Sequence, residues 1–126
     1  MDTVMVVDDS LFIRNHLSKL LARNGYESIL VEDGEQAVNA YRQTRPNVVL
    51  MDITMPRKDG LQALTEIREF DSRARVIMLT ALDQELAAMR AIHLGAKDFL
   101  VKPVPPSRLF AALRIVLGRD EQGARR

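Results

Sequence analysis

The chain contains no cysteine, so it can form neither a disulfide bond nor a metal site built on thiolates. It has no apolar run that approaches the roughly 20 residues of a membrane-spanning helix. A net charge of +1 gives no reason to expect binding to nucleic acid or to a membrane. The chain begins Met1-Asp2-Thr3 and continues directly into an apolar run, which we interpret as leaving no room for a signal peptide. Together with the absence of cysteine, this favours the cytoplasm.

The composition is that of one ordinary globular domain, with 47% hydrophobic and 28% charged residues over 126 positions. Short apolar runs alternate with segments of helical periodicity. We expect strands at 4–7, 28–31, 48–52, 76–80 and 98–101, and helices at 13–21, 33–42, 61–67, 83–94 and 109–117. This alternation predicts an α/β fold whose parallel sheet is covered by helices on both faces. We assign residues 1–118 to the domain and 119–126 to a polar tail, in which Arg119, Arg125 and Arg126 are expected to be solvated.

Capping residues mark the ends of several predicted helices. Ser10 is a competent N-cap for the first helix, and Asp33 with Gln36 three residues later has the capping-box pattern for the second. Asp83 is expected to open the fourth helix. The predicted stops are Gly25, Gly95 and Gly118.

Polar side chains follow four of the predicted strands. They are Asp8 and Asp9 after the first, Asp52 at the end of the third, Thr80 at the end of the fourth and Lys102 after the fifth. The carboxyl ends of parallel strands meet at one edge of the sheet, which is where open α/β folds bind ligands. Three carboxylates brought together there repel one another unless a cation joins them.

Each of these residues has an ordinary interpretation when it is taken alone. An acidic pair often satisfies a helix N-terminus, a strand-end aspartate often belongs to a turn, and threonine favours strands. A lysine before a proline is commonly a solvated loop charge. None of these explains why all five residues fall on one edge. His16 and His93 are expected to be exposed on helices away from that edge.

The same residues lie, in order, within the motifs of a known family. The motifs are Asp8-Asp9, Met51-Asp52-Ile53-Thr54-Met55-Pro56-Arg57-Lys58-Asp59-Gly60, Thr80-Ala81 and Gly95-Ala96-Lys97-Asp98-Phe99-Leu100-Val101-Lys102-Pro103. Together they resemble the receiver domain of a two-component response regulator over residues 3–118, and a single-domain chemotaxis-type regulator is the nearest kind. The resemblance implies a flavodoxin-like (βα)5 fold, a doubly wound five-stranded parallel sheet in the order 2-1-3-4-5.

The resemblance also implies a role for each acidic residue. Asp52 would accept a phosphoryl group and become an aspartyl phosphate. Asp9, Asp52 and the backbone carbonyl of Thr54 would bind a divalent cation, with Asp8 assisting through water. Mg²⁺ suits such all-oxygen ligands, and Mn²⁺ is an alternative.

The remaining residues of the motifs would bind the phosphoryl group and transmit the signal. Lys102 would pair with phosphoryl oxygens, and Thr80 would donate its hydroxyl to one of them. Thr80 and Phe99 would form a switch that reshapes the face made by the fourth helix, the fifth strand and the fifth helix. The peptide bond before Pro103 would be cis.

The resemblance implies partners rather than a small-molecule substrate. The phosphodonor would be a histidine kinase or a histidine phosphotransfer protein, and the output would be contact with a downstream protein. The domain would act as a monomer or a phosphorylation-dependent dimer. It would not be a conventional enzyme, because it would catalyse only its own Mg²⁺-dependent phosphorylation and dephosphorylation.

The chain departs from the family at two positions. Pro105 replaces the aspartate or serine often found before the fifth helix, so Pro106 is expected at the first helical position and Ser107 is expected to supply the cap. Leu82 replaces the acid or amide of some relatives. With Thr54 it is expected to flank the path of the hydrolytic water, which predicts slow loss of the phosphate.

Other classes fit parts of the pattern. A phosphatase of the haloacid dehalogenase type also uses a strand-end aspartate with Mg²⁺, but it would need a second aspartate where this chain has Thr54. A flavodoxin would need a phosphate-binding loop after the first strand, where Asp8-Asp9 would repel the flavin phosphate. The chain has no GxxxxGK[ST] motif, which excludes a P-loop. The remaining alternatives are a receiver cut from a longer regulator and a receiver-like interaction module that is never phosphorylated.

Overall fold

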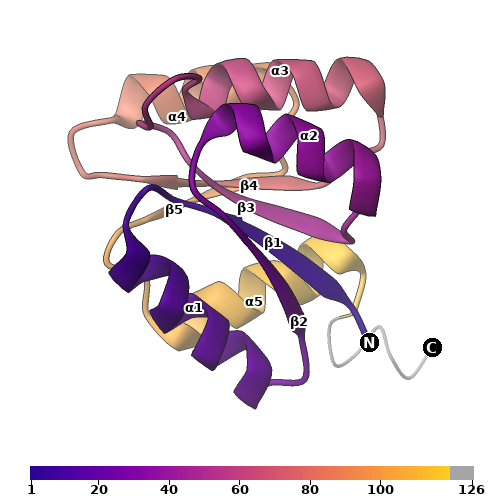
Figure 1. The fold of residues 1–126 in the computed structure, drawn as a ribbon. Helices are drawn as coiled ribbons and strands as arrows, with labels where there is room; N and C mark the ends of the chain where they lie inside the picture. Colours follow the sequence, from indigo (N-terminus) through magenta and orange to yellow (C-terminus); the bar gives the residue numbers. More distant parts are fainter. Residues whose placement is uncertain (120–126) are drawn as a thin grey trace.

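A computed structural model describes residues 1–119. Its strands are β1 (Thr3–Val7), β2 (Glu27–Val31), β3 (Val48–Asp52), β4 (Val76–Thr80) and β5 (Asp98–Val101). They form one parallel sheet in the order β2-β1-β3-β4-β5 (Figure 1). The predicted flavodoxin-like topology is confirmed.

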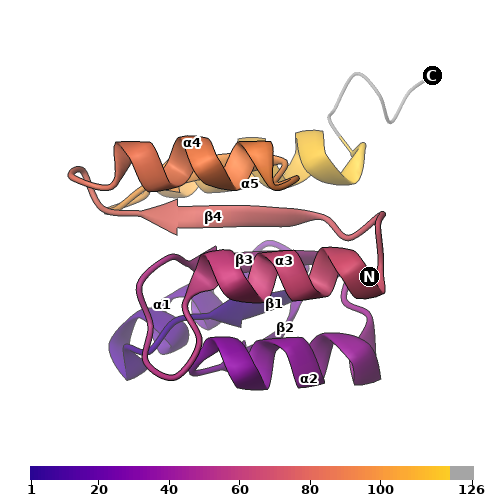
Figure 2. The ribbon, with the colours of Figure 1, turned by 90° about the horizontal axis from the view of Figure 1, so that it is seen from above.

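Helices follow each strand and cover both faces of the sheet. They are α1 (Leu11–Arg23), α2 (Gly34–Thr44), α3 (Gly60–Phe70), α4 (Glu85–His93) and α5 (Pro106–Leu117). Figure 1 shows α1 and α5 on one face and α2, α3 and α4 on the other. Seen from above, the axes of α2, α3 and α4 run roughly along the direction of the strands (Figure 2). Every ββ connection therefore crosses a face of the sheet, as in other doubly wound folds.

The central strands are apolar on both sides because both faces are covered. Every residue of β3 and β4 is buried. Met51 belongs to the apolar cluster that includes Leu64 of α3, whereas Leu50 belongs to the cluster that includes Leu113 of α5. Adjacent residues alternate between these two layers, so a polar side chain can reach water only where a strand ends.

Three helix N-caps accept hydrogen bonds through their side chains. The expected capping box of α2 is only half formed, because the Gln36 side chain donates to Glu32 at 3.3 Å rather than returning to the cap. The complete box is in α3, where Asp59 and Gln62 have the same spacing and bond reciprocally. The three caps are Ser10, Asp33 and Asp59.

The other two helices begin differently from the prediction. Gln84, not Asp83, occupies the N-cap position of α4, and its side chain is engaged elsewhere, as described below. Pro106 is the first residue of α5, as predicted, with Pro105 in the N-cap position and no side chain capping the helix. Ser107 therefore lies inside the first turn and is not a cap. The helix tolerates this because Pro106 has no N–H to satisfy.

Two glycines allow the loop between β3 and α3 to pack closely on its neighbours. A Cβ atom on Gly34 would lie 2.1 Å from the carbonyl oxygen of Lys58. A Cβ atom on Gly60 would lie 2.2 Å from the carbonyl oxygen of Asp52. Both obstructing atoms are backbone atoms, so a side chain at either position would displace the loop.

The end of the described chain is tied to its beginning. The guanidinium of Arg119 donates from Nε and Nη2 to the Asp2 carboxylate, each at 3.0 Å. The first residue of the predicted tail is therefore paired, while its side chain remains exposed as expected, and positions 120–126 lie outside the described residues. Within residues 1–119, no helix is long and apolar enough to cross a membrane.

Candidate functional site

The strand order brings the predicted site residues to one edge of the molecule. Asp52 ends β3, Thr80 ends β4, and the neighbouring strands β1 and β5 lead into Asp8 and Lys102. Asp9 follows in the loop that leads to α1. The carboxyl edge of the sheet is thus the polar edge that the sequence predicts.

Three carboxylates meet at this edge. Asp8, Asp9 and Asp52 each offer an oxygen, and these oxygens all lie within 4.8 Å of one another. Asp8 and Asp52 are buried, whereas Asp9 is exposed. The oxygens form a compact all-oxygen set, which matches the ligand preference of Mg²⁺ and Mn²⁺ better than that of a metal that favours thiolate or imidazole.

The Lys102 ammonium joins two of the carboxylates. Its Nζ lies 3.1 Å from Asp8 Oδ2 and 3.1 Å from Asp52 Oδ1. Burial by itself would lower the pKa of Lys102, but Asp52 and Asp8 outweigh it and raise that pKa above its ordinary value. Burial raises the pKa of Asp52; Lys102 opposes the rise, while Asp8 adds to it.

Asp8 is fixed at every polar atom. Its backbone N–H donates to the Val31 carbonyl at 3.1 Å, and its own carbonyl accepts from Arg14 Nη1 at 2.6 Å. Its Oδ1 accepts from the Ser10 N–H at 2.9 Å, while Oδ2 faces Lys102. With both carboxylate oxygens already bonded, Asp8 is suited to positioning Lys102 rather than to binding a ligand directly.

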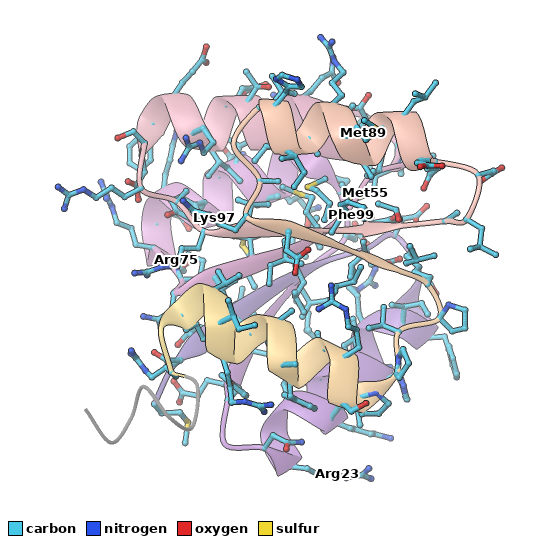
Figure 3. The ribbon with its side chains drawn as sticks, turned by 180° about the vertical axis from the view of Figure 1, so that it is seen from behind. Arg23, Met55, Arg75, Met89, Lys97 and Phe99 are labelled. Carbon is cyan, nitrogen blue, oxygen red and sulfur yellow. The ribbon has the colours of Figure 1, made fainter. Side chains whose placement is uncertain are left out.

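Thr80 and Phe99 lie on the same side of the sheet. The register pairs Thr80 with Val101 and Met78 with Phe99, so these side chains share one face. Thr80 is buried and Phe99 is half-buried against the apolar cluster that includes Met55 (Figure 3). A cavity of about 270 Å³ lies between them, lined also by Ala81, Leu82, Glu85 and Val101.

The loop after Asp52 is held in place by residues that the sequence did not single out for this role. Arg57, in a left-handed conformation with φ of 66°, donates from Nε to the buried Asp33 carboxylate at 2.8 Å. Burial alone would raise the pKa of Asp33, but the N–H of Gln36 and the Arg57 guanidinium outweigh it and lower that pKa. Lys58 accepts from the Gly34 N–H at 3.1 Å. The start of α2 thus anchors the loop that carries Thr54.

The polar neighbour of Thr54 is Gln84. Its Nε2 donates to Thr54 Oγ1 at 2.5 Å. Leu82, which we expected to flank the path of the hydrolytic water together with Thr54, is 84% exposed. The amide that position 82 lacks is therefore supplied to Thr54 by Gln84, two residues further along the chain.

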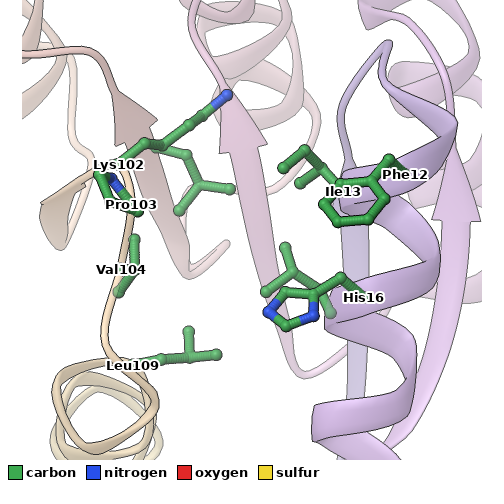
Figure 4. Close-up of a pocket in the computed structure, with 9 residues that line it drawn as sticks. Phe12, Ile13, His16, Lys102, Pro103, Val104 and Leu109 are labelled. Carbon is green, nitrogen blue, oxygen red and sulfur yellow. The ribbon is translucent and has the colours of Figure 1, made fainter.

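An apolar cavity of about 200 Å³ flanks the site, between α1 and the segment that follows β5 (Figure 4). Lys102 and Pro103 line one side, and Phe12 and His16 line the other. The Lys102–Pro103 peptide bond is cis. His16 and His93 are both exposed, but His16 stacks on Phe12 with ring centroids 6.1 Å apart, so it lies closer to the site than expected.

Comparison with known proteins agrees with this geometry. The family model for the response regulator receiver domain matches residues 4–114. Chemotaxis protein CheY of Bacillus subtilis is 43% identical over 115 residues, which are 90% of this chain and 96% of that protein. CheY of Thermotoga maritima is 41% identical over 114 residues, 90% of this chain and 95% of that protein.

A solved structure is similar over the same length. The receiver domain of NtrX from Brucella abortus has a TM-score of 0.88 at 31% identity, covering 93% of this chain and 99% of that one. The range matched by the family model includes the strand ends that carry Asp8, Asp52, Thr80 and Lys102. The chain therefore belongs to the response regulator receiver domains of two-component signalling.

Proposed function

We propose that this protein accepts a phosphoryl group on Asp52 from a histidine kinase or a histidine phosphotransfer protein. The observation that carries the proposal is the bridge from Lys102 to Asp52 and Asp8, with Asp9 close by at the same edge. Phosphoryl transfer requires charge neutralisation and positioning more than proton chemistry. A strand-end carboxylate with an ammonium on one side and a cation site on the other meets both requirements.

The acidic cluster is the proposed cation site. Asp9, Asp52 and the backbone carbonyl of Thr54 would hold Mg²⁺ or Mn²⁺, with Asp8 acting through water. Three carboxylates facing one paired ammonium leave an excess of two negative charges, which one divalent ion matches. When bound, the ion would neutralise charge on the transferring phosphoryl group.

In the proposed reaction, an Asp52 carboxylate oxygen forms a bond to phosphorus as the bond from phosphorus to the donor's histidine nitrogen breaks. Lys102 neutralises charge on the phosphoryl oxygens, and Thr80 donates its hydroxyl to one of them. Hydrolysis later returns Asp52 to its free form. The protein is thus a catalyst of its own modification rather than a conventional enzyme.

The proposed output is a switch that runs from Thr80 to Phe99. A phosphate at Asp52 brings about two negative charges and three acceptor oxygens, which draw Thr80 inward. The cavity between Thr80 and Phe99 gives the Phe99 ring room to turn in. This movement would reshape the face made by α4, β5 and α5. The two helices carry exposed apolar side chains, Met89 on α4 and Ile115 on α5 among them. A downstream protein, or a second copy of the domain, would bind there.

Labelling with a small phosphodonor in the presence of Mg²⁺ should add one acid-labile phosphate, detected by intact mass. Asp52→Asn should abolish it, because the amide is not a nucleophile at this position, whereas Glu69→Gln on the exposed side of α3 should label normally. Equal labelling of Asp52→Asn would overturn the assignment. A folded wild-type protein that never labels would indicate an interaction module instead.

Mg²⁺ should stabilise the folded protein, by about 2.7 kcal/mol at one hundred times its dissociation constant. Asp9→Asn should remove most of this gain and should raise the melting temperature of the metal-free protein, because one of three repelling carboxylates is gone. Asp83→Asn, which removes an exposed charge, is the matched control. The two variants are compared by thermal unfolding at constant ionic strength; an equal response to Mg²⁺ in both would contradict the proposed site.

Docking of the phosphodonor should depend on α1 and the segment before α5, between which the cavity of Figure 4 lies. Asn15 is exposed on α1 and Pro105 is exposed before α5, and these two elements lie on either side of the cavity that Lys102 lines. Asn15→Ala or Pro105→Ala should therefore change the rate of transfer from a partner kinase several-fold and leave small-donor labelling unchanged. Asn39→Ala, on the opposite layer of helices, should change neither rate. If both rates fall together in the Asn15 and Pro105 variants, the residues support the site rather than the docking.

A further inference from the structure

Gln84 ties two loops together across the mouth of the site. Its side-chain Oε1 accepts the Ala81 N–H at 2.8 Å, and its own N–H donates to the Ala81 carbonyl at 3.1 Å. Because the Ala81 donor fixes which amide atom is the oxygen, Nε2 must face Thr54, to which it donates at 2.5 Å. Gln84 therefore holds both polar backbone groups of Ala81 and is itself held by Thr54.

These contacts lie just beyond the paired parts of β3 and β4. The register pairs Asp52 with Leu79 near the ends of these strands, and Thr54 and Ala81 each follow two residues further along the chain. Ala81 is covalently joined to Thr80. Any inward movement of Thr80 toward a phosphoryl group on Asp52 therefore pulls on Ala81 and strains its hydrogen bonds to Gln84.

The two sides of this bridge are not equally fixed. Thr54 begins a loop that is anchored from behind by Arg57 on Asp33 and by Gly60, whose N–H donates to the Ile53 carbonyl at 2.7 Å. The segment 81–83, in contrast, is exposed and borders the cavity of about 270 Å³. Thr54 is therefore the fixed end of the bridge, and the segment from Ala81 to Gln84 is the end that can move.

We infer that Gln84 is a latch that holds Thr80 in its resting position and opposes the switched conformation. The inference rests on the proposed function of Asp52 and Thr80. The latch must release Thr54 or Ala81 before Thr80 can move, so its hydrogen bonds stabilise the resting state alone. Gln84 thereby sets how much of the unphosphorylated protein adopts the switched state.

The test is the affinity for beryllofluoride, a phosphate mimic, in the presence of Mg²⁺. Titration is followed by amide chemical shifts at Phe99 and in α4. Gln84→Met keeps the length of the side chain but loses both of its hydrogen bonds, so its half-saturating concentration should fall about threefold to tenfold, as expected for one or two net hydrogen bonds. Gln84→Ala should shift in the same direction. Gln36→Met, the same change on the surface of α2, should bind as the wild type does.

Thermal unfolding separates a latch from a helix cap. A latch predicts that Gln84→Met lowers the melting temperature of the free protein more than that of the beryllofluoride complex. A residue that only caps α4 would lower both equally and leave the affinity unchanged, and that result, or weaker binding, overturns the inference. If the wild type binds beryllofluoride and labels on Asp52, only the latch has failed. If the wild type does neither, the proposed function fails with it.

Discussion

The arrangement of the site depends on the ion pairs that Lys102 makes with Asp8 and Asp52. These carboxylates come from the ends of two different strands, and the ammonium reaches them from a third, at 3.1 Å in both cases. Placing three carboxylates at one edge is unfavourable in isolation, and burial of Asp8 and Asp52 increases the cost. Lys102 offsets part of it. What is left over is negative charge that a divalent cation would neutralise, so that an anionic phosphoryl group could approach Asp52.

The rest of the fold keeps this charge cluster in place on one side and leaves it adjustable on the other. Covered faces make the central strands β3 and β4 apolar until they end, so their polar residues lie only at the edge. The start of α2 anchors the loop after Asp52 through Asp33 and Arg57. The loop after Thr80 lacks such an anchor among the described contacts and is joined to the site through Gln84. A change of charge at Asp52 would therefore change the conformation mainly at the end of β4 and in α4.

Much of this was predictable from the sequence because buried parallel strands are continuous apolar runs whose first polar residue marks the edge. Asp52 after Val48–Met51 is the clearest case, and Lys102 after β5 is another. The contacts of Arg57 and Gln84 were not predictable, since they join residues 24 and 30 positions apart and depend on the shape of the loops. The spacing of Asp59 and Gln62 did carry a capping signal that could have been used. At α4 the local rule favoured Asp83, but the longer Gln84 side chain reaches both Ala81 and Thr54.

We propose that Lys102 and the divalent cation balance the charge of the same carboxylates. The most direct test is the Mg²⁺ dissociation constant of Lys102→Met, measured by titration at constant ionic strength, with Lys97→Met on the exposed surface as the control. Removing the ammonium takes away a positive charge that competes with the ion, so Lys102→Met should bind Mg²⁺ several-fold more tightly than the wild type while Lys97→Met should not. Unchanged or weaker binding in Lys102→Met would contradict the claim.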